Sequence, residues 1–213
     1  MIIINSTNTE SITPVVEMAN SKNIPVITVD RKSSGGEIIC HIESDNLEGG
    51  RMASRVLARL LKGKGNVIEI EGIPGTSAAH ERAMGFNEGL RNYPEITVVA
   101  REVANFDRLE AREVMYGLLK KGTEFDAVFA HNDNMILGVI DALEEMKIQS
   151  PRVLIGFDAI REAVQAVKQG RLTATIAQKP ETMGRLSIES SVLYFRGEKL
   201  PSVTLVELSL ITK

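Results

Sequence analysis

The stretch that decides the fold reads Asn23-Ile24-Pro25-Val26-Ile27-Thr28-Val29-Asp30-Arg31. Its middle is a run of apolar and β-branched residues without polar alternation, which predicts a strand covered on both faces. An acid and a guanidinium follow at the carboxyl end of this strand, which is where open parallel sheets bind ligands. The stretch therefore predicts a buried parallel strand with a polar site at its end.

Strands of this kind alternate with helical patterns along the chain. Most predicted strands begin roughly 20–30 residues apart, about one strand–helix unit each. Such alternation is typical of parallel sheets with helices on both faces, so we predict an α/β fold. The predicted strands are Ile2–Asn5, Pro25–Val29, Ile38–Ile42, Asn66–Glu71, Thr97–Val103, Ala127–Ala130, Val153–Phe157, Ala174–Ala177 and Val203–Leu210, and the predicted helices cover residues 11–22, 45–62, 76–92, 107–121, 133–147, 159–169 and 180–196.

Helix-capping residues support several of these boundaries. Asp107 can cap a helix, and Glu110 three positions later completes a capping-box pattern. Asp133 follows a strand and could cap the next helix. Gly170 has the position of a left-handed C-terminal cap.

The composition excludes several classes of function. Lys and Arg number 25 against 28 for Asp and Glu, and the net charge of −3 offers no basic surface for nucleic acid or anionic membrane. The single cysteine, Cys40, excludes an internal disulfide and is interpreted as a small buried apolar residue. Three scattered histidines disfavour a zinc enzyme, and no apolar run approaches the roughly 20 residues of a membrane helix.

No pattern in the sequence predicts catalysis. No nucleophile is accompanied by a base, and no Gly-rich loop is followed by the Lys-Ser/Thr of a phosphate-binding loop. The loop from Gly72 to Gly75 has Gly-x-x-Gly spacing after a strand, but it lacks the full glycine set of a dinucleotide loop. We therefore predict a binding protein without enzymatic activity, metal or cofactor.

Polar and aromatic side chains follow six of the predicted strands. A sugar ring offers hydroxyls that donate and accept hydrogen bonds, and a C–H face that packs on aromatic rings. Taken singly, each side chain has a structural interpretation: Asp107, Asp133 and Asp158 as helix caps, Phe106 and Phe157 as core residues, Arg31 and Arg82 as surface charges, and His80 and His131 as structural or exposed residues. The set as a whole favours sugar binding.

These motifs resemble the ribose-binding proteins of bacterial ABC importers. The resemblance runs in order from Met1 to Lys213 and is carried by residues 23–31, 44–46, 71–79, 105–108, 129–133, 156–158 and 174–178. It implies a two-lobed type I periplasmic binding protein fold, in which each lobe is a doubly wound, mostly parallel sheet. Crossovers near Ser44-Asp45, Gln178-Lys179 and Glu207-Leu208 would assign residues 1–44 and 179–207 to the first lobe, and residues 45–178 and 208–213 to the second.

The resemblance also implies which residues contact the sugar. Carboxylates and amides would bond the ring hydroxyls, the two arginines would each span neighbouring oxygens, and the aromatic rings would supply apolar contact. The implied contacts are Asp30, Arg31, Arg82, Phe106, Asn132, Phe157, Asp158 and Gln178. His131 stands where family members have a smaller or amide side chain, which leaves its role open.

One departure from the family concerns the first lobe. Family members carry two further strand–helix units before the strand that matches Ile2–Asn5, together about 60 residues. We therefore expect the second lobe to fold, the first to be incomplete, and the bare edge of Ile2–Asn5 to favour self-association. We also expect a reduced sugar affinity for this chain.

The function that the resemblance implies is delivery of a pentose, D-ribose, to an ABC permease by closure of the two lobes. The full-length protein would be periplasmic or anchored outside the cell membrane. One alternative is the effector-binding core of a LacI-type transcription regulator, which would need a helix-turn-helix upstream. Another is the ectodomain of a sensor kinase. The sugar-contact set favours the importer interpretation, in which nucleic acid is not a partner.

Overall fold

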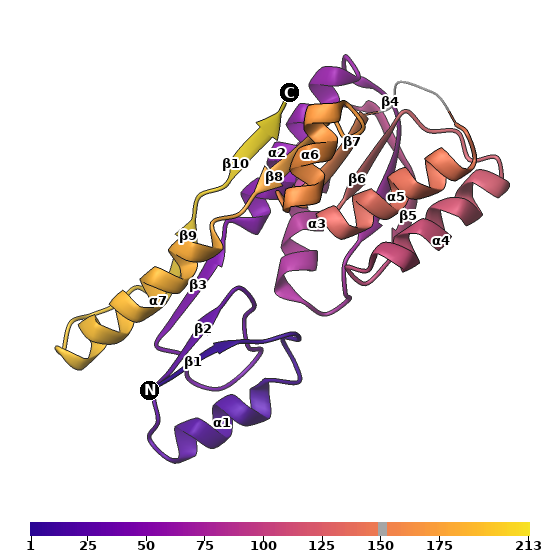
Figure 1. The fold of residues 1–213 in the computed structure, drawn as a ribbon. Helices are drawn as coiled ribbons and strands as arrows, with labels where there is room; N and C mark the ends of the chain where they lie inside the picture. Colours follow the sequence, from indigo (N-terminus) through magenta and orange to yellow (C-terminus); the bar gives the residue numbers. More distant parts are fainter. Residues whose placement is uncertain (149–152) are drawn as a thin grey trace. The chain divides into compact units, whose positions relative to one another are not determined.

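The structure, a computed structural model, describes residues 1–148 and 153–213 (Figure 1). Strands and helices alternate through both described ranges, which confirms the predicted α/β class. The elements are β1 (Ile2–Asn5), α1 (Thr13–Ser21), β2 (Val26–Val29), β3 (Cys40–Ser44), α2 (Asn46–Leu60), β4 (Lys64–Glu71), α3 (Ser77–Leu90), β5 (Glu95–Val103), α4 (Arg108–Lys120), β6 (Ala127–Ala130), α5 (Asp133–Glu145), β7 (Val153–Asp158), α6 (Arg161–Gln169), β8 (Ala174–Ala177), α7 (Pro180–Phe195), β9 (Val203–Val206) and β10 (Ser209–Thr212).

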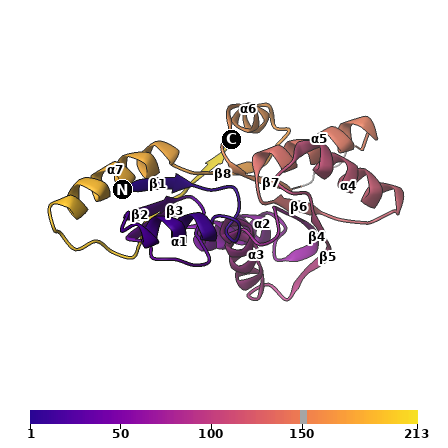
Figure 2. The same ribbon diagram turned by 90° about the horizontal axis from the view of Figure 1, so that it is seen from below.

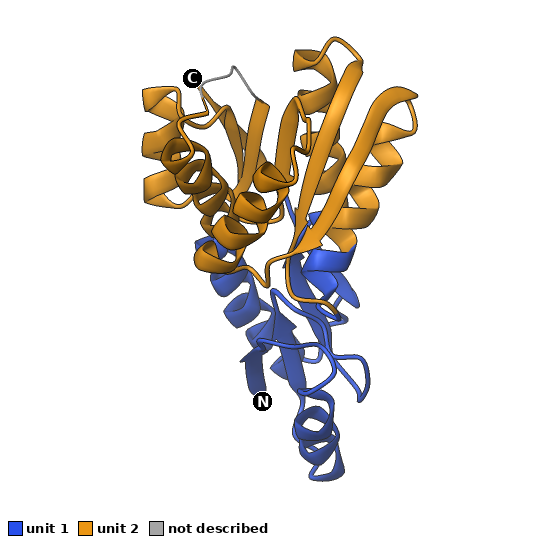
Figure 3. Cartoon of the chain, turned by 90° about the vertical axis from the view of Figure 1, so that its right-hand side faces the viewer, with its two compact units in different colours: residues 1–46, 75–80, 178–208 blue, residues 47–74, 81–177, 209–213 orange. Residues whose placement is uncertain are grey.

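The chain forms two compact units, each with its own sheet (Figure 3). Unit 1 comprises residues 1–46, 75–80 and 178–208, and unit 2 comprises residues 47–74, 81–177 and 209–213. The sheet of unit 1 has the order β1-β2-β3-β9, and all its strand pairs are parallel. The sheet of unit 2 has the order β10-β8-β7-β6-β4-β5, and only β10 runs antiparallel to its neighbour.

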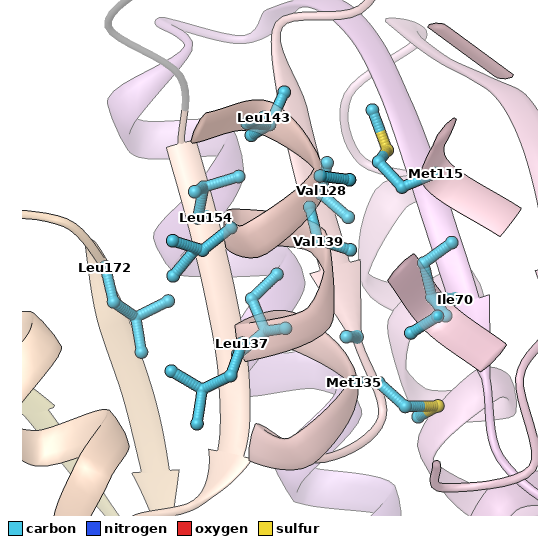
Figure 4. Close-up of a cluster of buried hydrophobic side chains, with 14 of the residues drawn as sticks. Ile70, Met115, Val128, Met135, Leu137, Val139, Leu143, Leu154 and Leu172 are labelled. Carbon is cyan, nitrogen blue, oxygen red and sulfur yellow. The ribbon is translucent and has the colours of Figure 1, made fainter. Parts of the chain in front are cut away.

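Unit 2 holds the larger hydrophobic core, which fixes the strand ends that carry the candidate site (Figure 4). On one face of its sheet, α4, α5 and α6 bury residues such as Met115, Val139 and Val167 against β4, β6 and β7. On the other face, Phe86 of α3 packs on Phe129 of β6, with ring centroids 4.6 Å apart. Both faces are covered at β6 and β7, which is why these two strands are almost continuously apolar.

Unit 1 has a smaller core on each face of its sheet. Helix α7 covers Ile27 and Ile42 on one face, and α1 covers Val26 on the other (Figure 2). Cys40 is fully buried in the α7 side of this core, as predicted for a small apolar residue. Along β1, Ile2 and Ile3 each remain 39% exposed, and β2 is the only described strand that pairs with β1.

The final strand departs from the prediction. The apolar run Val203–Leu210 forms two strands, because β9 pairs with β3 in unit 1 whereas β10 pairs with β8 in unit 2. The change of partner falls at Leu208 and Ser209, where the chain passes between the units. A continuous apolar pattern reports burial but not the identity of the neighbouring strand.

One predicted cap and one predicted capping box are also corrected. Asp133 does not cap α5; Asn132 does, because its Oδ1 accepts from the Met135 amide at 2.9 Å. Asp107 caps α4 as predicted, but Glu110 accepts from the Asn105 side chain, so the reciprocal bond of a capping box is replaced. None of the helices in the two described ranges combines the length and apolarity needed to cross a bilayer.

Candidate functional site

Arg82 of α3 lies at the centre of the candidate site in unit 2. Its side chain is only 4% exposed, so the interpretation of Arg82 as a surface charge is wrong. One Nη donates to the main-chain oxygen of His131 at 2.5 Å and lies 3.7 Å from Oδ1 of Asp158. The guanidinium carbon lies 3.7 Å from the centre of the Phe157 ring, a stacked arrangement that fixes its plane. These contacts hold a cation in one orientation at the strand ends.

The ring of Phe106 lies against the turn that follows β4. A Cβ added at Gly72 would come within 2.1 Å of the ring, so only glycine permits this approach. The backbone of Phe106 has φ +61°, in the left-handed region that non-glycine residues seldom adopt. The Arg82 guanidinium lies 6.0 Å from the ring centre. The aromatic face is therefore held beside the cation at a cost in backbone strain.

Asn132 connects this loop to α5. Besides capping the helix, its Nδ2 donates to the main-chain oxygen of Phe106 at 3.2 Å. The side chain is largely buried. One more N–H and one more lone pair of the amide are chemically able to bond a ligand.

Asp158 ends β7 in a turn of unusual geometry. Asp158 and Ala159 have φ values of +112° and +55°. Asp133 holds this turn, because its carboxylate accepts from the Ile160 amide at 2.8 Å and from Oγ1 of Thr175 at 2.7 Å. Thr175 in turn accepts from the Ala159 amide at 3.2 Å. Asp133 thus fixes the direction of the Asp158 carboxylate.

The environment of Asp133 alters its acidity. Burial raises the pKa of Asp133 to about 7, and the negative charge of Asp158 adds to this rise, while the hydrogen bonds from Thr175 and Ile160 oppose it. Gly156 leaves the room that the carboxylate occupies, since a Cβ there would lie 2.2 Å from Oδ1 of Asp133.

The three remaining predicted residues belong to unit 1. Asp30 follows β2 with φ +69°. Arg31 donates through Nη1 to the carbonyl oxygens of Ser6 and Thr7, at 3.3 and 3.1 Å. Gln178 follows β8, and its Oε1 accepts from Ser44 at 2.7 Å. All three are partly exposed.

The structure thus links five of the eight predicted residues through direct contacts in unit 2: Arg82, Phe106, Asn132, Phe157 and Asp158. Phe157 is fully buried, where it supports Arg82. The sequence analysis missed the positioning role of Asp133 and the contacts of Gly72, because both depend on residues distant in the sequence. Within the described residues, no group of three or more His, Cys, Asp or Glu side chains is placed to hold a metal ion.

This arrangement can bind a small polar molecule. It offers a fixed guanidinium, an amide, a carboxylate and an aromatic ring at the carboxyl ends of adjacent strands, the edge at which open α/β sheets bind ligands. Three of the eight predicted residues, Asp30, Phe106 and Asp158, have positive φ. Such strain is concentrated at ligand-binding sites in proteins.

Known proteins are similar to this chain in both sequence and fold. Residues 1–199 match the family described as periplasmic binding protein domain. The chain is 39% identical over its whole length to the ribose import binding protein RbsB of Escherichia coli strain K12, and it spans 71% of that protein. It is 41% identical to the corresponding protein of Haemophilus influenzae strain Rd, of which it spans 72%.

A solved structure shows that the fold is also similar to that of a known sugar-binding domain. The fructose-binding periplasmic domain of a hybrid two-component system superposes with a TM-score of 0.93 at 30% identity, over 100% of this chain and 71% of that one. The predicted type I periplasmic binding fold is therefore confirmed. Sequence and fold agree that this chain belongs to the periplasmic binding protein domain family, whose members are solute-binding proteins and not enzymes.

Proposed function

We propose that this chain, a sugar-binding component of the ABC-importer type, binds a pentose, D-ribose. The observation that carries the proposal is the linked group of Arg82, Phe106, Asn132 and Asp158, in which bidentate hydrogen-bonding groups surround one aromatic face. The identity of about 40% to ribose import binding proteins supports this choice of sugar.

Each side chain has a defined part in this proposal. Arg82 donates to two neighbouring ring oxygens, which suits its planar and immobilised guanidinium. Asp158 accepts from hydroxyls, Asn132 both donates and accepts, and Phe106 packs on the C–H face of the ring. Phe157 is fully buried, so in this proposal it acts on the sugar through Arg82, on which it stacks, and not by direct contact.

Unit 1 supplies the remaining contacts in this proposal. Asp30 and Arg31 would bond hydroxyls on the other side of the ring, and Gln178, at a crossover between the proposed lobes, would bond a further hydroxyl. We propose that the lobes comprise residues 1–44 with 179–207, and residues 45–178 with 208–213, and that they close around the sugar in the periplasm or outside the cell membrane. Closure presents the loaded protein to an ABC permease. Small-angle scattering with saturating ribose should report a smaller radius of gyration, and an unchanged radius would refute closure.

Isothermal titration calorimetry tests the choice of sugar. D-ribose should bind more tightly than D-glucose or D-galactose, because the additional hydroxymethyl of a hexose meets Phe106 and the polar group around it. Tighter binding of either hexose would overturn the proposal. Equal heats for all three sugars and for a buffer blank would show that the site does not recognise these sugars.

A further inference from the structure

His131 and Glu69 form a fully buried pair beneath the site of unit 2. Both side chains are 0% exposed, and Nε2 of His131 lies 3.1 Å from Oε1 of Glu69. Burying an imidazole and a carboxylate away from water is costly unless each polar atom has a partner. The contacts of the remaining atoms therefore show what this pair supports.

The second ring nitrogen fixes the tautomer of His131. The main-chain amide of Gly72 donates to Nδ1 at 3.3 Å, so Nδ1 is an acceptor and Nε2 carries the proton that faces Glu69. The other oxygen of Glu69 accepts from Nε of Arg101 at 2.7 Å and from Asn87 at 3.5 Å. The hydrogen bond to Glu69 also raises the pKa of Arg101 above its usual value. Every polar atom of the pair is thus engaged.

The pair reaches the candidate site by two routes. The main-chain oxygen of His131 accepts from Arg82 at 2.5 Å. The amide that His131 holds belongs to Gly72, on which the ring of Phe106 lies. His131 therefore connects the Arg82 guanidinium and the Phe106 ring, although its own side chain is fully buried.

We propose that His131, paired with Glu69, is a positioning residue that holds Gly72 beneath Phe106 and sets the binding geometry of unit 2. This inference rests on the proposed function, since its consequence is measured as ribose affinity. A side chain without the Nδ1 acceptor leaves the Gly72 amide without this bond, so we expect ribose affinity to fall.

Two substitutions at His131 separate positioning from packing. In H131Q the amide oxygen can accept from Gly72 while the amide nitrogen donates to Glu69, and the side chain does not titrate. H131L fills similar space and makes neither bond. H80Q is the matched control, because His80 is exposed. Ribose affinity of the full chain is measured by calorimetry at neutral pH, together with hydrogen exchange of the Gly72 amide.

The inference predicts about tenfold weaker ribose binding and loss of Gly72 protection in H131L, with both retained in H131Q and H80Q. Equal affinity and equal Gly72 protection in H131L and the native chain would overturn the inference. Long-range ¹H–¹⁵N spectra report the tautomer of His131 without added sugar. A proton on Nδ1 of His131 at neutral pH would also overturn the inference. Absence of ribose binding in the native chain would refute the proposed function and leave these spectra and the Gly72 exchange to decide the role of His131.

Discussion

Arg82 is buried, and its guanidinium donates to the main-chain oxygen of His131 and lies 3.7 Å from a carboxylate oxygen of Asp158. Stacking on Phe157 restricts the side chain to one plane. In the proposed complex, the guanidinium donates to sugar hydroxyls from this fixed position. The cost of ordering this long side chain is then met in folding and not in binding.

Truncation of Arg82 tests this view. R82A should weaken ribose binding by about 3 kcal/mol, roughly a hundredfold, because buried hydroxyls and Asp158 lose a charged partner. R185A is the control, since the Arg185 side chain is 59% exposed and pairs with Glu189 one turn along α7. Calorimetry measures the ribose affinity of both variants. A loss of less than about 1 kcal/mol of binding free energy in R82A would show that Arg82 contributes only to the fold.

The titration of Asp133 makes the free energy of unfolding depend on pH. Its pKa is raised from 3.8 to about 7 by burial, so between these values the folded chain binds more protons than the unfolded chain. The free energy of unfolding should therefore fall as pH rises through this interval, and this loss should be complete above about pH 7. Glu43 acts oppositely, because hydrogen bonds from His41 and Lys32 outweigh its burial and lower its pKa, so its contribution is lost only in stronger acid.

The variant D133N removes the titration. Urea unfolding between pH 4.5 and 7.5 should show the fall in the native chain and a flatter profile in D133N, which is also less stable because an amide cannot accept from both Ile160 and Thr175. Parallel profiles for the two proteins would mean that Asp133 is ionised in the fold throughout this range.

The β4–α3 turn and the β5–α4 loop act as one support through the contact of Gly72 with Phe106. In G72A the new methyl group must displace the ring, so we expect a loss of about 1–3 kcal/mol in stability and weaker ribose binding. G117A in α4 is the matched control, because a Cβ there meets nothing within 4 Å and alanine favours the helix by about 0.5–1 kcal/mol. Thermal unfolding gives the stability of G72A and G117A, and calorimetry gives their ribose affinity. Equal stability of the two variants would show that the Phe106 ring can move aside without cost.

Local patterns predicted most elements because helices and buried strands carry their own periodicity. The capping residue Asp107 supports a predicted helix over residues 107–121, and α4 spans Arg108–Lys120. The division of Val203–Leu210 between β9 and β10 was not predictable in this way, since it depends on which strands lie alongside. The support of Phe106 by Gly72, and of Asp158 by Asp133, likewise arises from contacts between distant residues that spacing does not report.

The two units differ in how fully their apolar surfaces are covered. In unit 2 the helices enclose a continuous core. In unit 1, β1 has Ile2 and Ile3 each 39% exposed, and α7 carries an exposed stripe at Ile188, Val192 and Phe195. An apolar strand edge with unpaired backbone groups readily pairs with another chain.

Self-association of the 213-residue chain is therefore expected. Sedimentation velocity over increasing protein concentration should reveal oligomers, and I3K should shift the distribution toward monomer because a charge on an edge strand opposes pairing. L109K provides the control, since Leu109 of α4 is 66% exposed and distant in sequence from β1. A native chain that stays monomeric at all concentrations, or an equal response of both variants, would contradict a role for β1.

The linked group in unit 2 is proposed to recognise ribose. An NMR titration tests ribose binding at these residues most directly, even when the affinity is low. With D-ribose added to the native chain, the amide signals of Phe106, Asn132 and Asp158 should shift in a saturable manner, whereas those of Leu60 and Asn66, at the opposite ends of the strands and helices of unit 2, should not. R82A should abolish these shifts at the same ribose concentration. Saturable shifts elsewhere with none at these three residues, or no shifts at tens of millimolar ribose, would contradict the account.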